Sequence, residues 1–410
     1  MRHLLVQRLG RTRSTRVALA LGVTAVALLT AAGAHGRNTL TVCPAGPPEC
    51  QYATVQEALT AASNGDRILI APGSYGAGFT VGKSVSLIGS GESQTSLSGG
   101  QAAVTISAGV TVGILGLTIS DAETGVVNLG TLTLRTSTIR DNGNGDVGVG
   151  GIINDGTLTL RDSAIIHNHG PQVAGIRNSG SATIVATVLD RNGAMGPANI
   201  ENTGYLELRN STVAGGVCEH ACALFNQSGA TALVIDTVVS GNSSQSGTVT
   251  NDGILTIRGS TIRANEASFS APGAIENSFS GVVTIKDTRI TGNRNNFQVG
   301  PGAIGNDGRM TLEDTKVVGN GGGDGGGLHN RGTGILTLSS STVRENTAET
   351  IGGGILNDGT AELKHSVVTR NIAIQGLDGH FGGGIYNSGT VTLRHSSVRG
   401  NIPDDCFGCP

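Results

Sequence analysis

Residues that could act on a substrate are few and scattered in this sequence. The segment after Asn371 is the longest stretch between two of the repeats described below, and long loops often carry function. A carboxylate near histidines could serve in acid–base chemistry, and this region supplies the weak candidates Asp378, His380 and Tyr386, with His329 upstream. A polar surface loop explains the same residues, so the sequence assigns no catalytic residue.

The acidic residues do not form the groupings that a lyase or a hydrolase needs. Glu201 and Glu276 are expected to lie three repeats apart, about 14 Å at the spacing of paired strands. That is too far to share a cation that requires about six oxygens. A hydrolase needs two carboxylates at a defined separation, and no such pair stands out. Turn formation accounts for the aspartates of the Asn-Asp-Gly sequences, which never fall in adjacent repeats: Asp155, Asp252, Asp307 and Asp358.

A column of basic residues is the clearest candidate for binding. One position of the repeat is basic in seven of eleven copies: Arg135, Arg161, Arg209, Arg258, Lys286, Lys364 and Arg394. On stacked strands these residues would form an exposed cationic stripe of about 50 Å, suited to a polyanion such as polyuronate or a cell-wall phosphate polymer. The alternative is a solvated sheet face whose charges keep the surface soluble, since like charges one strand apart repel.

The six cysteines fall in three close pairs: Cys43 with Cys50, Cys218 with Cys222, and Cys406 with Cys409. Local disulfides are expected if the chain is exported. A zinc site at the last pair would need two further ligands, and none is suitably spaced. We therefore predict no metal and no cofactor.

A repeat of about 26 residues positions all these side chains. Its units consist of short apolar-alternating runs separated by Asn and Gly, which predicts strands and tight turns without a crossover helix. A second Asn ends nearly every unit, and five residues before it all eleven copies have Ser or Thr. The repeat is marked by eleven asparagines at intervals of 24 to 30 residues: Asn128, Asn154, Asn178, Asn202, Asn226, Asn251, Asn277, Asn306, Asn330, Asn357 and Asn387.

Stacking gives the asparagines a structural role. Successive coils place like residues about 4.8 Å apart, and a buried carboxamide can donate to one neighbour and accept from the other. Stacked Ser and Thr hydroxyls are expected to satisfy one another in the same way. With 66 glycines and only 3% aromatic residues, the chain lacks the bulky groups of a globular core. We predict an all-β fold, a right-handed parallel β-helix (solenoid) of roughly 13 coils with a short N-terminal capping helix.

The N-terminus predicts export. Five arginines precede an apolar run over residues 17–29 and small residues up to Ala34, the order of a cleavable secretory signal. No later stretch is long and apolar enough to span a bilayer, so we expect a secreted or cell-surface protein without an integral membrane segment after cleavage. The expected boundaries are 1–34 for the signal peptide, 35–64 for an N-terminal segment with the capping helix, 65–402 for the β-helix and 403–410 for a C-terminal tail.

Three segments resemble the first coils of pectin-lyase-like right-handed parallel β-helix proteins: ATVQEAL at 53–59, GDRILIAPGSY at 65–75 and VSLIG at 85–89. The asparagine-bearing coils resemble exported bacterial repeat proteins of the same superfamily. The resemblance implies the fold but not the activity, because the superfamily includes lyases, polygalacturonases, epimerases, tailspikes and proteins without a known reaction. The Asn-Thr-Asp and Gly-His-Gly motifs of the polygalacturonases find no match, and Asp404-Asp405 lies in the tail.

Three hypotheses follow from these observations. The first is a non-catalytic extracellular or cell-surface scaffold that binds polysaccharide, with an anionic polysaccharide or cell-wall polymer as partner. The alternative is a polysaccharide lyase or glycoside hydrolase of the pectin-lyase-like superfamily, and the third is a purely structural or adhesive array. The absence of Trp disfavours an enzyme, because carbohydrate clefts usually present aromatic faces. A formal net charge of −3 gives no indication of nucleic acid binding.

Overall fold

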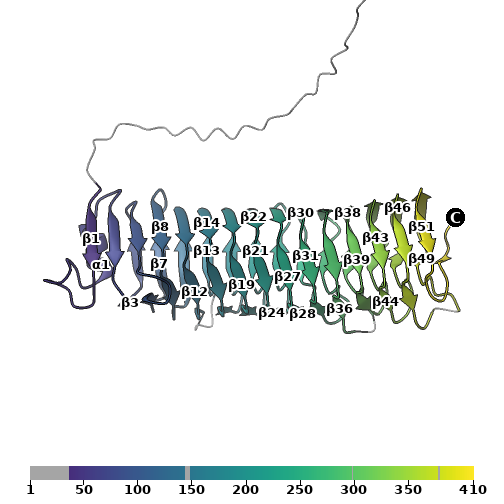
Figure 1. Cartoon of the computed structure of the whole chain (residues 1–410), viewed down its shortest axis with the longest axis horizontal. Helices are drawn as coiled ribbons and strands as arrows, with labels where there is room; N and C mark the ends of the chain where they lie inside the picture. The colour runs from purple at the N-terminus through teal and green to yellow at the C-terminus, as the bar shows by residue number, and fades with distance from the viewer. Residues whose placement is uncertain (1–36, 144–147, 298, 377–378) are drawn as a thin grey trace, which may run out of the picture. The chain divides into compact units, whose positions relative to one another are not determined.

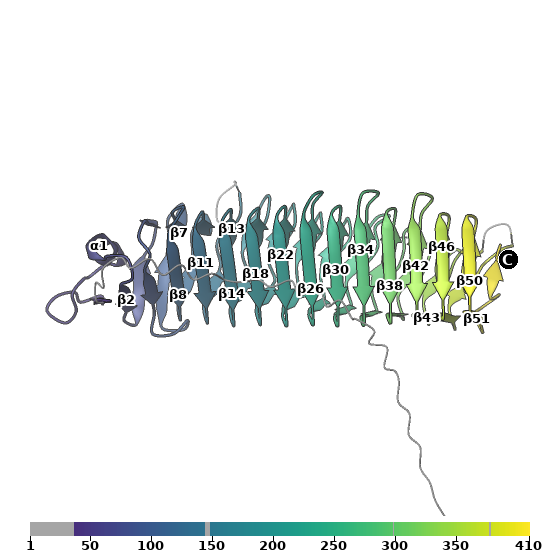
Figure 2. The ribbon, with the colours of Figure 1, turned by 90° about the horizontal axis from the view of Figure 1, so that it is seen from above.

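The strands of this chain wind around a single axis as a parallel solenoid (Figures 1 and 2). The computed structural model describes residues 37–143, 148–297, 299–376 and 379–410, so the predicted signal peptide lies outside it. Three sheets of 15, 14 and 14 parallel strands run along the axis, beside a shorter nine-stranded one. We call the first three sheets A, B and C. Each coil adds one strand to each, which gives about 14 coils instead of the roughly 13 expected.

One coil from the middle shows the pattern. The chain passes through β21 (Ile200–Asn202) in sheet C, β22 (Tyr205–Arg209) in sheet A, β23 (Thr212–Ala214) in sheet B and β24 (Val217–Cys218) in the nine-stranded sheet. Side chains alternate between the core and the surface, so Leu206 and Leu208 are buried. A single left-handed residue, here Asn210 (φ 48°), turns the chain from sheet A to sheet B. Asp, Asn and His tolerate this conformation better than most residues, and four of the equivalent corners carry an aspartate: Asp162, Asp236, Asp287 and Asp314.

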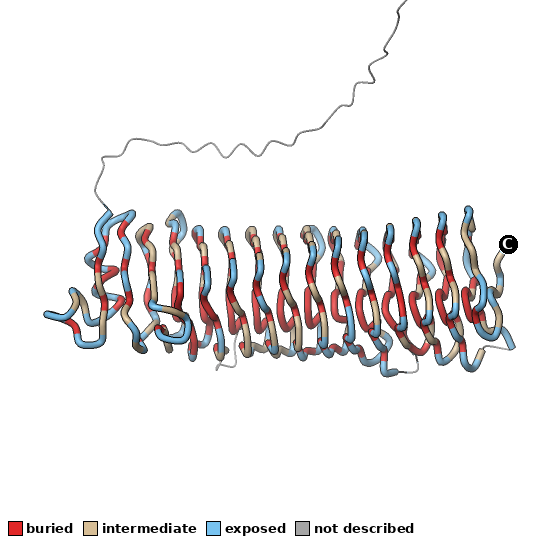
Figure 3. The backbone as a smooth tube through the Cα atoms, in the orientation of Figure 1, coloured by how far each residue is buried: buried red, intermediate tan, exposed pale blue. Residues whose placement is uncertain are grey.

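The core is a set of aliphatic columns along the inside of the coils (Figure 3). The Ser and Thr column lies among them but bonds differently from the prediction. Ser137 Oγ donates to the Arg135 carbonyl (2.7 Å), and the Ser163 hydroxyl accepts from the Ser137 amide (3.4 Å). The hydroxyls therefore satisfy backbone groups and not one another, because the corner leaves a carbonyl and an amide in need of partners.

The predicted asparagine ladder is confirmed. From Asn128 to Asn387, each side-chain Nδ2 donates to the Oδ1 of the next copy at 2.6 to 2.9 Å. A second ladder runs through the asparagines that end the units, as in the 3.0 Å bond from Asn142 to Asn168. Both ladders end in the C-terminal tail. Asp405 Oδ1 accepts from Asn401 Nδ2 (3.1 Å), and the Gly408 carbonyl accepts from Asn387 Nδ2 (2.8 Å).

The second ladder lacks a rung at Gly216, and another residue fills the gap. Asn199 reaches the empty space from the adjoining loop: its Oδ1 accepts from Asn192 Nδ2 (2.8 Å), and its Nδ2 lies 3.4 Å from Asn242 Oδ1. A Cβ on Gly216 would meet Asn199 Nδ2 at 2.6 Å. The carboxamide from residue 199 therefore takes the place of the missing side chain.

Both ends of the solenoid carry additional structure. The expected helix is α1 (Val55–Ala61), which has a capping box between Thr54 and Glu57. Its apolar face joins the core cluster and contacts β1 (Thr39–Val42) and β2 (Arg67–Ile70). At the other end β52 (Cys406–Phe407) pairs with β49 (Ile385–Asn387). The six cysteines form the three local disulfides Cys43–Cys50, Cys218–Cys222 and Cys406–Cys409. Among the described residues, no helix is long and apolar enough to cross a membrane.

Candidate functional site

A cleft of about 640 Å³ opens on the outer face of sheet C. Its floor lies over β33 (Ile275–Asn277), β37 (Ile304–Asn306) and β41 (Leu328–Asn330). The loops that lead from the nine-stranded sheet into sheet C form its walls. The cleft is lined by Gln245, Ser246, Phe269, Ser270, Ala271, Glu276, Val299, Gly300, Pro301, Asp307, Asp324, His329 and Arg331.

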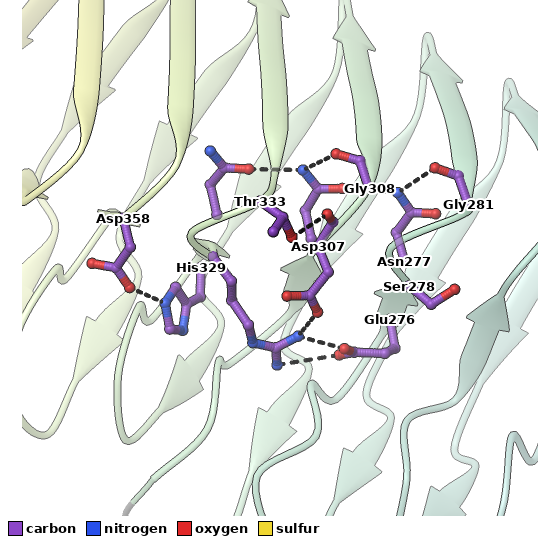
Figure 4. Close-up of polar contacts among 12 residues, drawn as sticks. Glu276, Asn277, Ser278, Gly281, Asp307, Gly308, His329, Thr333 and Asp358 are labelled. Carbon is purple, nitrogen blue, oxygen red and sulfur yellow. Dashed lines mark hydrogen bonds and ion pairs between the residues drawn. The ribbon is translucent and has the colours of Figure 1, made fainter.

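A guanidinium between two carboxylates forms the floor of the cleft (Figure 4). Arg331 Nη1 lies 2.5 Å from Glu276 Oε1 and 2.7 Å from Asp307 Oδ2, and its Nη2 lies 3.4 Å from Glu276 Oε2. Three successive coils supply the three residues. The three side chains are only 19 to 31% exposed to solvent. Each charge is therefore compensated mainly by the other charges of the cluster.

Gly305 makes room for this cluster. It occupies the outward position of β37, between Glu276 and His329 in the neighbouring strands. A Cβ at this position would meet Glu276 Oε2 at 2.5 Å and Arg331 Nη2 at 3.0 Å. A side chain here would therefore displace the ends of Glu276 and Arg331 from their present positions, and it is this space and not the backbone conformation that the glycine provides.

The negative charge of the Glu276 carboxylate is only partly compensated by its partners. Burial raises the pKa of this carboxyl above its ordinary value, even though the charge and hydrogen bonds of Arg331 act to lower it. Removal of a carboxylate from water disfavours its ionised form. Because the guanidinium also serves Asp307, the floor of the cleft retains an excess of negative charge.

His329 lies beside this cluster and pairs with the next coil. Its Nε2 is 2.7 Å from Asp358 Oδ2, and Ser388 Oγ donates to Asp358 Oδ1 at 2.5 Å. The hydrogen bond with His329 is the main reason why the pKa of Asp358 is lowered, with a smaller contribution from Ser388.

This lowered pKa predicts a specific loss of stability in acid. A carboxyl whose folded-state pKa is depressed stabilises the fold above its unfolded-state pKa, about 3.9, and this contribution is lost as the pH falls through the folded value. We expect Asp358→Asn to lower the melting temperature at pH 6 and to have progressively less effect below about pH 4. Thermal unfolding of both proteins between pH 2.5 and 7 measures the difference. If the difference in melting temperature between the two proteins did not change with pH, the ionised Asp358 carboxylate would not be the source of this stability.

An apolar wall lines the same cleft as the charged floor. The rings of Phe269 and Phe297 lie 5.7 Å apart in a tilted arrangement. Phe269 is 55% exposed and the neighbouring Val299 52%. Exposed apolar side chains gathered beside polar groups are typical of binding sites.

The sequence candidates near the C-terminus do not form one cluster. His329 belongs to the cleft, two strands of sheet C before Tyr386. His380 stacks on Phe407 at 4.1 Å between ring centroids, and Tyr386 lies 4.8 Å from the same ring. Asp378 lies outside the described residues. The three aromatic rings form a surface cluster between the last loop and the tail, without a described carboxylate in contact.

The cationic stripe lies on the outer face of sheet A, but glutamates interrupt it. Arg209 pairs with Glu207, Lys286 with Glu313 at 2.8 Å, and Lys364 and Arg394 both pair with Glu362 at 2.8 Å. Arg135, Arg161 and Arg258 make no ion pair with the described residues. The stripe and the cleft occupy different sheets, so they are separate surfaces with opposite charge.

The cleft also corrects the role expected of two aspartates. Asp307 and Asp358 follow ladder asparagines in turns, as predicted, but they also pair with Arg331 and His329. One signal could have located the site from the sequence. The residue directly after each ladder asparagine is basic only at Arg331; the other ten are Leu129, Asp155, Ser179, Thr203, Gln227, Asp252, Ser278, Asp307, Asp358 and Ser388.

Comparisons with known proteins concern the chain fold. No protein-family model matches, and no curated protein matches in sequence. Among solved structures, the A-module of Azotobacter vinelandii mannuronan C-5 epimerase AlgE6 is 14% identical, with a TM-score of 0.37 over 83% of this chain and 92% of that one. The catalytic unit of a Streptomyces thermodiastaticus GH87 α-1,3-glucanase is 14% identical, with a TM-score of 0.41 over 83% and 65%. The PL6 alginate lyase AlyGC is 11% identical, with a TM-score of 0.30 over 87% and 78%.

Proposed function

We propose that this protein is a secreted, non-catalytic β-helix that binds a saccharide in the cleft over β33, β37 and β41. The observation that carries the proposal is the combination of an exposed apolar wall with a polar floor in one cleft. Such a combination suits a sugar, whose faces are apolar and whose edges carry hydroxyl groups. The charged side chains are held in place by one another, which reduces the ordering needed on binding.

Arg331 supports binding over catalysis. One of its nitrogens contacts both carboxylates of the floor, so the guanidinium occupies the space between Glu276 and Asp307. A glycosidase must place the scissile bond between its two carboxyl groups. The predicted export signal and the pairing of all six cysteines in disulfides support an extracellular location.

A glycoside hydrolase is the second candidate, and one observation favours it. Glu276 and Asp307 have oxygens within 2.7 Å of the same nitrogen, so the two carboxyl groups lie close together. Burial raises the pKa of Glu276, as a general acid requires. Release of reducing ends from polysaccharides by the wild-type chain, and its loss in Glu276→Gln, would establish the hydrolase and overturn the non-catalytic proposal.

The substitution Gly305→Ala tests the saccharide site without replacing any charged residue. The added methyl group collides with Glu276 and Arg331, so we expect the cluster to be displaced and saccharide affinity to fall at least about tenfold, with little change in folding. Binding of the mature chain to a panel of immobilised polysaccharides measures this. The matched control is Gly113→Ala in β8 (Thr111–Leu115) of sheet A, where a Cβ meets only the Ser86 side chain at 3.5 Å. Equal binding by both variants, or no retention of the wild-type chain by any polysaccharide, would contradict the proposed site.

A further inference from the structure

The charge of the cleft restricts the saccharides that it can accept. Its lining contains three carboxylates, Glu276, Asp307 and Asp324, against the single guanidinium of Arg331. With His329 neutral, the formal charge is −2, and Asp358 adds a further carboxylate behind His329. A polyuronate would place its own carboxylates against this floor and be repelled. The anionic partner expected from the sequence suits the stripe on sheet A, and not this cleft.

The positive charge already present does not neutralise the floor. Arg331 is shared between two carboxylates, and its contacts do not offset the effect of burial on Glu276. Asp324 has no cationic partner within the described residues; its side chain accepts a hydrogen bond from Thr350. A second cation entering the cleft would therefore gain attraction from groups that are already fixed in position.

The apolar wall adds a second, independent restriction. Phe269 and Val299 line the same cleft as the charged floor, and Phe297 extends this apolar surface. An aromatic ring binds the apolar face of a sugar ring and also attracts a nearby ammonium group. The required ligand therefore has an apolar face and a cationic edge within one unit.

We propose that the cleft binds an amino sugar polymer, with the ammonium group of one unit held between Asp307 and Asp324 and the sugar face against Phe269. This inference rests on the proposed saccharide-binding function and specifies its ligand. Glu276 and Arg331 position Asp307 in this arrangement. A lysine-rich peptide offers the same charge but lacks the flat apolar face that the wall accommodates.

The experiment compares three hexasaccharides by calorimetric titration of the full mature chain: β-1,4-linked glucosamine, its N-acetylated counterpart and galacturonate. The first two share one backbone and differ in charge. We expect glucosamine hexamer to bind at least about tenfold more tightly than the N-acetylated one at pH 6, with the advantage reduced by added salt. Galacturonate hexamer should show no binding to the cleft.

Two variants and one control locate the binding. Asp324→Asn and Glu276→Gln should each lower the affinity for the glucosamine hexamer about tenfold. The affinity for the N-acetylated hexamer should remain almost unchanged. Asp324 lies outside the Arg331 ion pair, so its variant keeps the test valid if Glu276→Gln disturbs folding. Asp252→Asn is the matched control, because Asp252 follows a ladder asparagine as Asp307 does but does not line the cleft.

Each outcome decides a different point. Equal affinity for the charged and acetylated hexamers, abolished by Gly305→Ala, would overturn the amino sugar inference and keep the saccharide site. Failure of all three hexamers to bind would overturn the amino sugar inference, and the panel of immobilised polysaccharides would then decide whether the cleft binds any saccharide. Equally tight binding of a lysine-rich peptide would also overturn the inference, because the cleft would then select charge alone.

Discussion

Asn202→Ala is expected to lower the free energy of unfolding by about 2–4 kcal/mol. Asn202 is fully buried in the middle of the first ladder. Its Nδ2 donates to Asn226 Oδ1 (2.8 Å) and to two carbonyls, and its Oδ1 accepts from Asn178 Nδ2 (2.7 Å). Alanine removes these bonds and leaves buried groups of two neighbouring coils unpaired, where water cannot replace the partner.

Hydrogen exchange followed along the chain is the appropriate measurement, since a stack of coils can open in parts. The loss of protection should be centred on the coils that contain Asn178, Asn202 and Asn226. Asn296→Ala serves as the control, because Asn296 is exposed and its side chain bonds, among the described residues, only to exposed Glu266. A similar, small effect of both substitutions would mean that the ladder contributes little to stability.

Arg331→Gln is expected to be the second large effect, at about 2–3 kcal/mol, and it should also abolish saccharide binding. Loss of one partner of a fully buried ion pair destabilises by roughly 3–5 kcal/mol, and the partial exposure of this cluster reduces that value. The physical cause is that Glu276 and Asp307 remain close together without their shared cation. The pKa of Glu276 should rise further in this variant, because the charge that lowers it has gone.

A surface pair provides the comparison for this variant. Arg140 and Asp141 lie 2.7 Å apart, with side chains 50% and 42% exposed, and Arg140→Gln should change stability by less than about 1 kcal/mol. The double variant Glu276→Gln with Arg331→Gln should recover part of the lost stability, since fewer charges are left unpaired. Chemical denaturation of the wild-type chain and the three variants measures these differences. Equal losses for Arg331→Gln and Arg140→Gln would show that the floor of the cleft behaves as ordinary surface.

The sequence predicts the fold well because the fold repeats. A stacked coil places the same residue type in the same environment many times, so Asn128 and its ten counterparts reveal a buried ladder without any knowledge of the coordinates. The alternation in segments such as Tyr205–Arg209 assigns the inward side chains for the same reason. The number of coils is less well predicted, because the first coils lack the asparagine.

The candidate site is not predicted, because it depends on departures from the repeat. Arg331 and Glu276 are 55 residues apart and belong to different columns of the coil. Comparing the outward residues directly before each ladder asparagine finds Glu276 and His329. It does not find the Arg331 guanidinium, which lies over Gly305 but belongs to another column. The cationic stripe shows a different effect of reading one column at a time. Counting one column finds seven basic residues and overlooks Glu207 and Glu362 in the next outward column.

The replacement of the missing ladder side chain at Gly216 by Asn199 limits how the sequence of such a chain can evolve. The space in the ladder is now occupied by Asn199, so restoring an asparagine at residue 216 would force two carboxamides into one place. Replacing Asn199 first would leave Asn192 and Asn242 without their present partner. The two positions are thus coupled, and a return to the regular repeat requires both substitutions together. A repeat protein of this kind can therefore leave or regain its consensus at such a rung only when two positions change together.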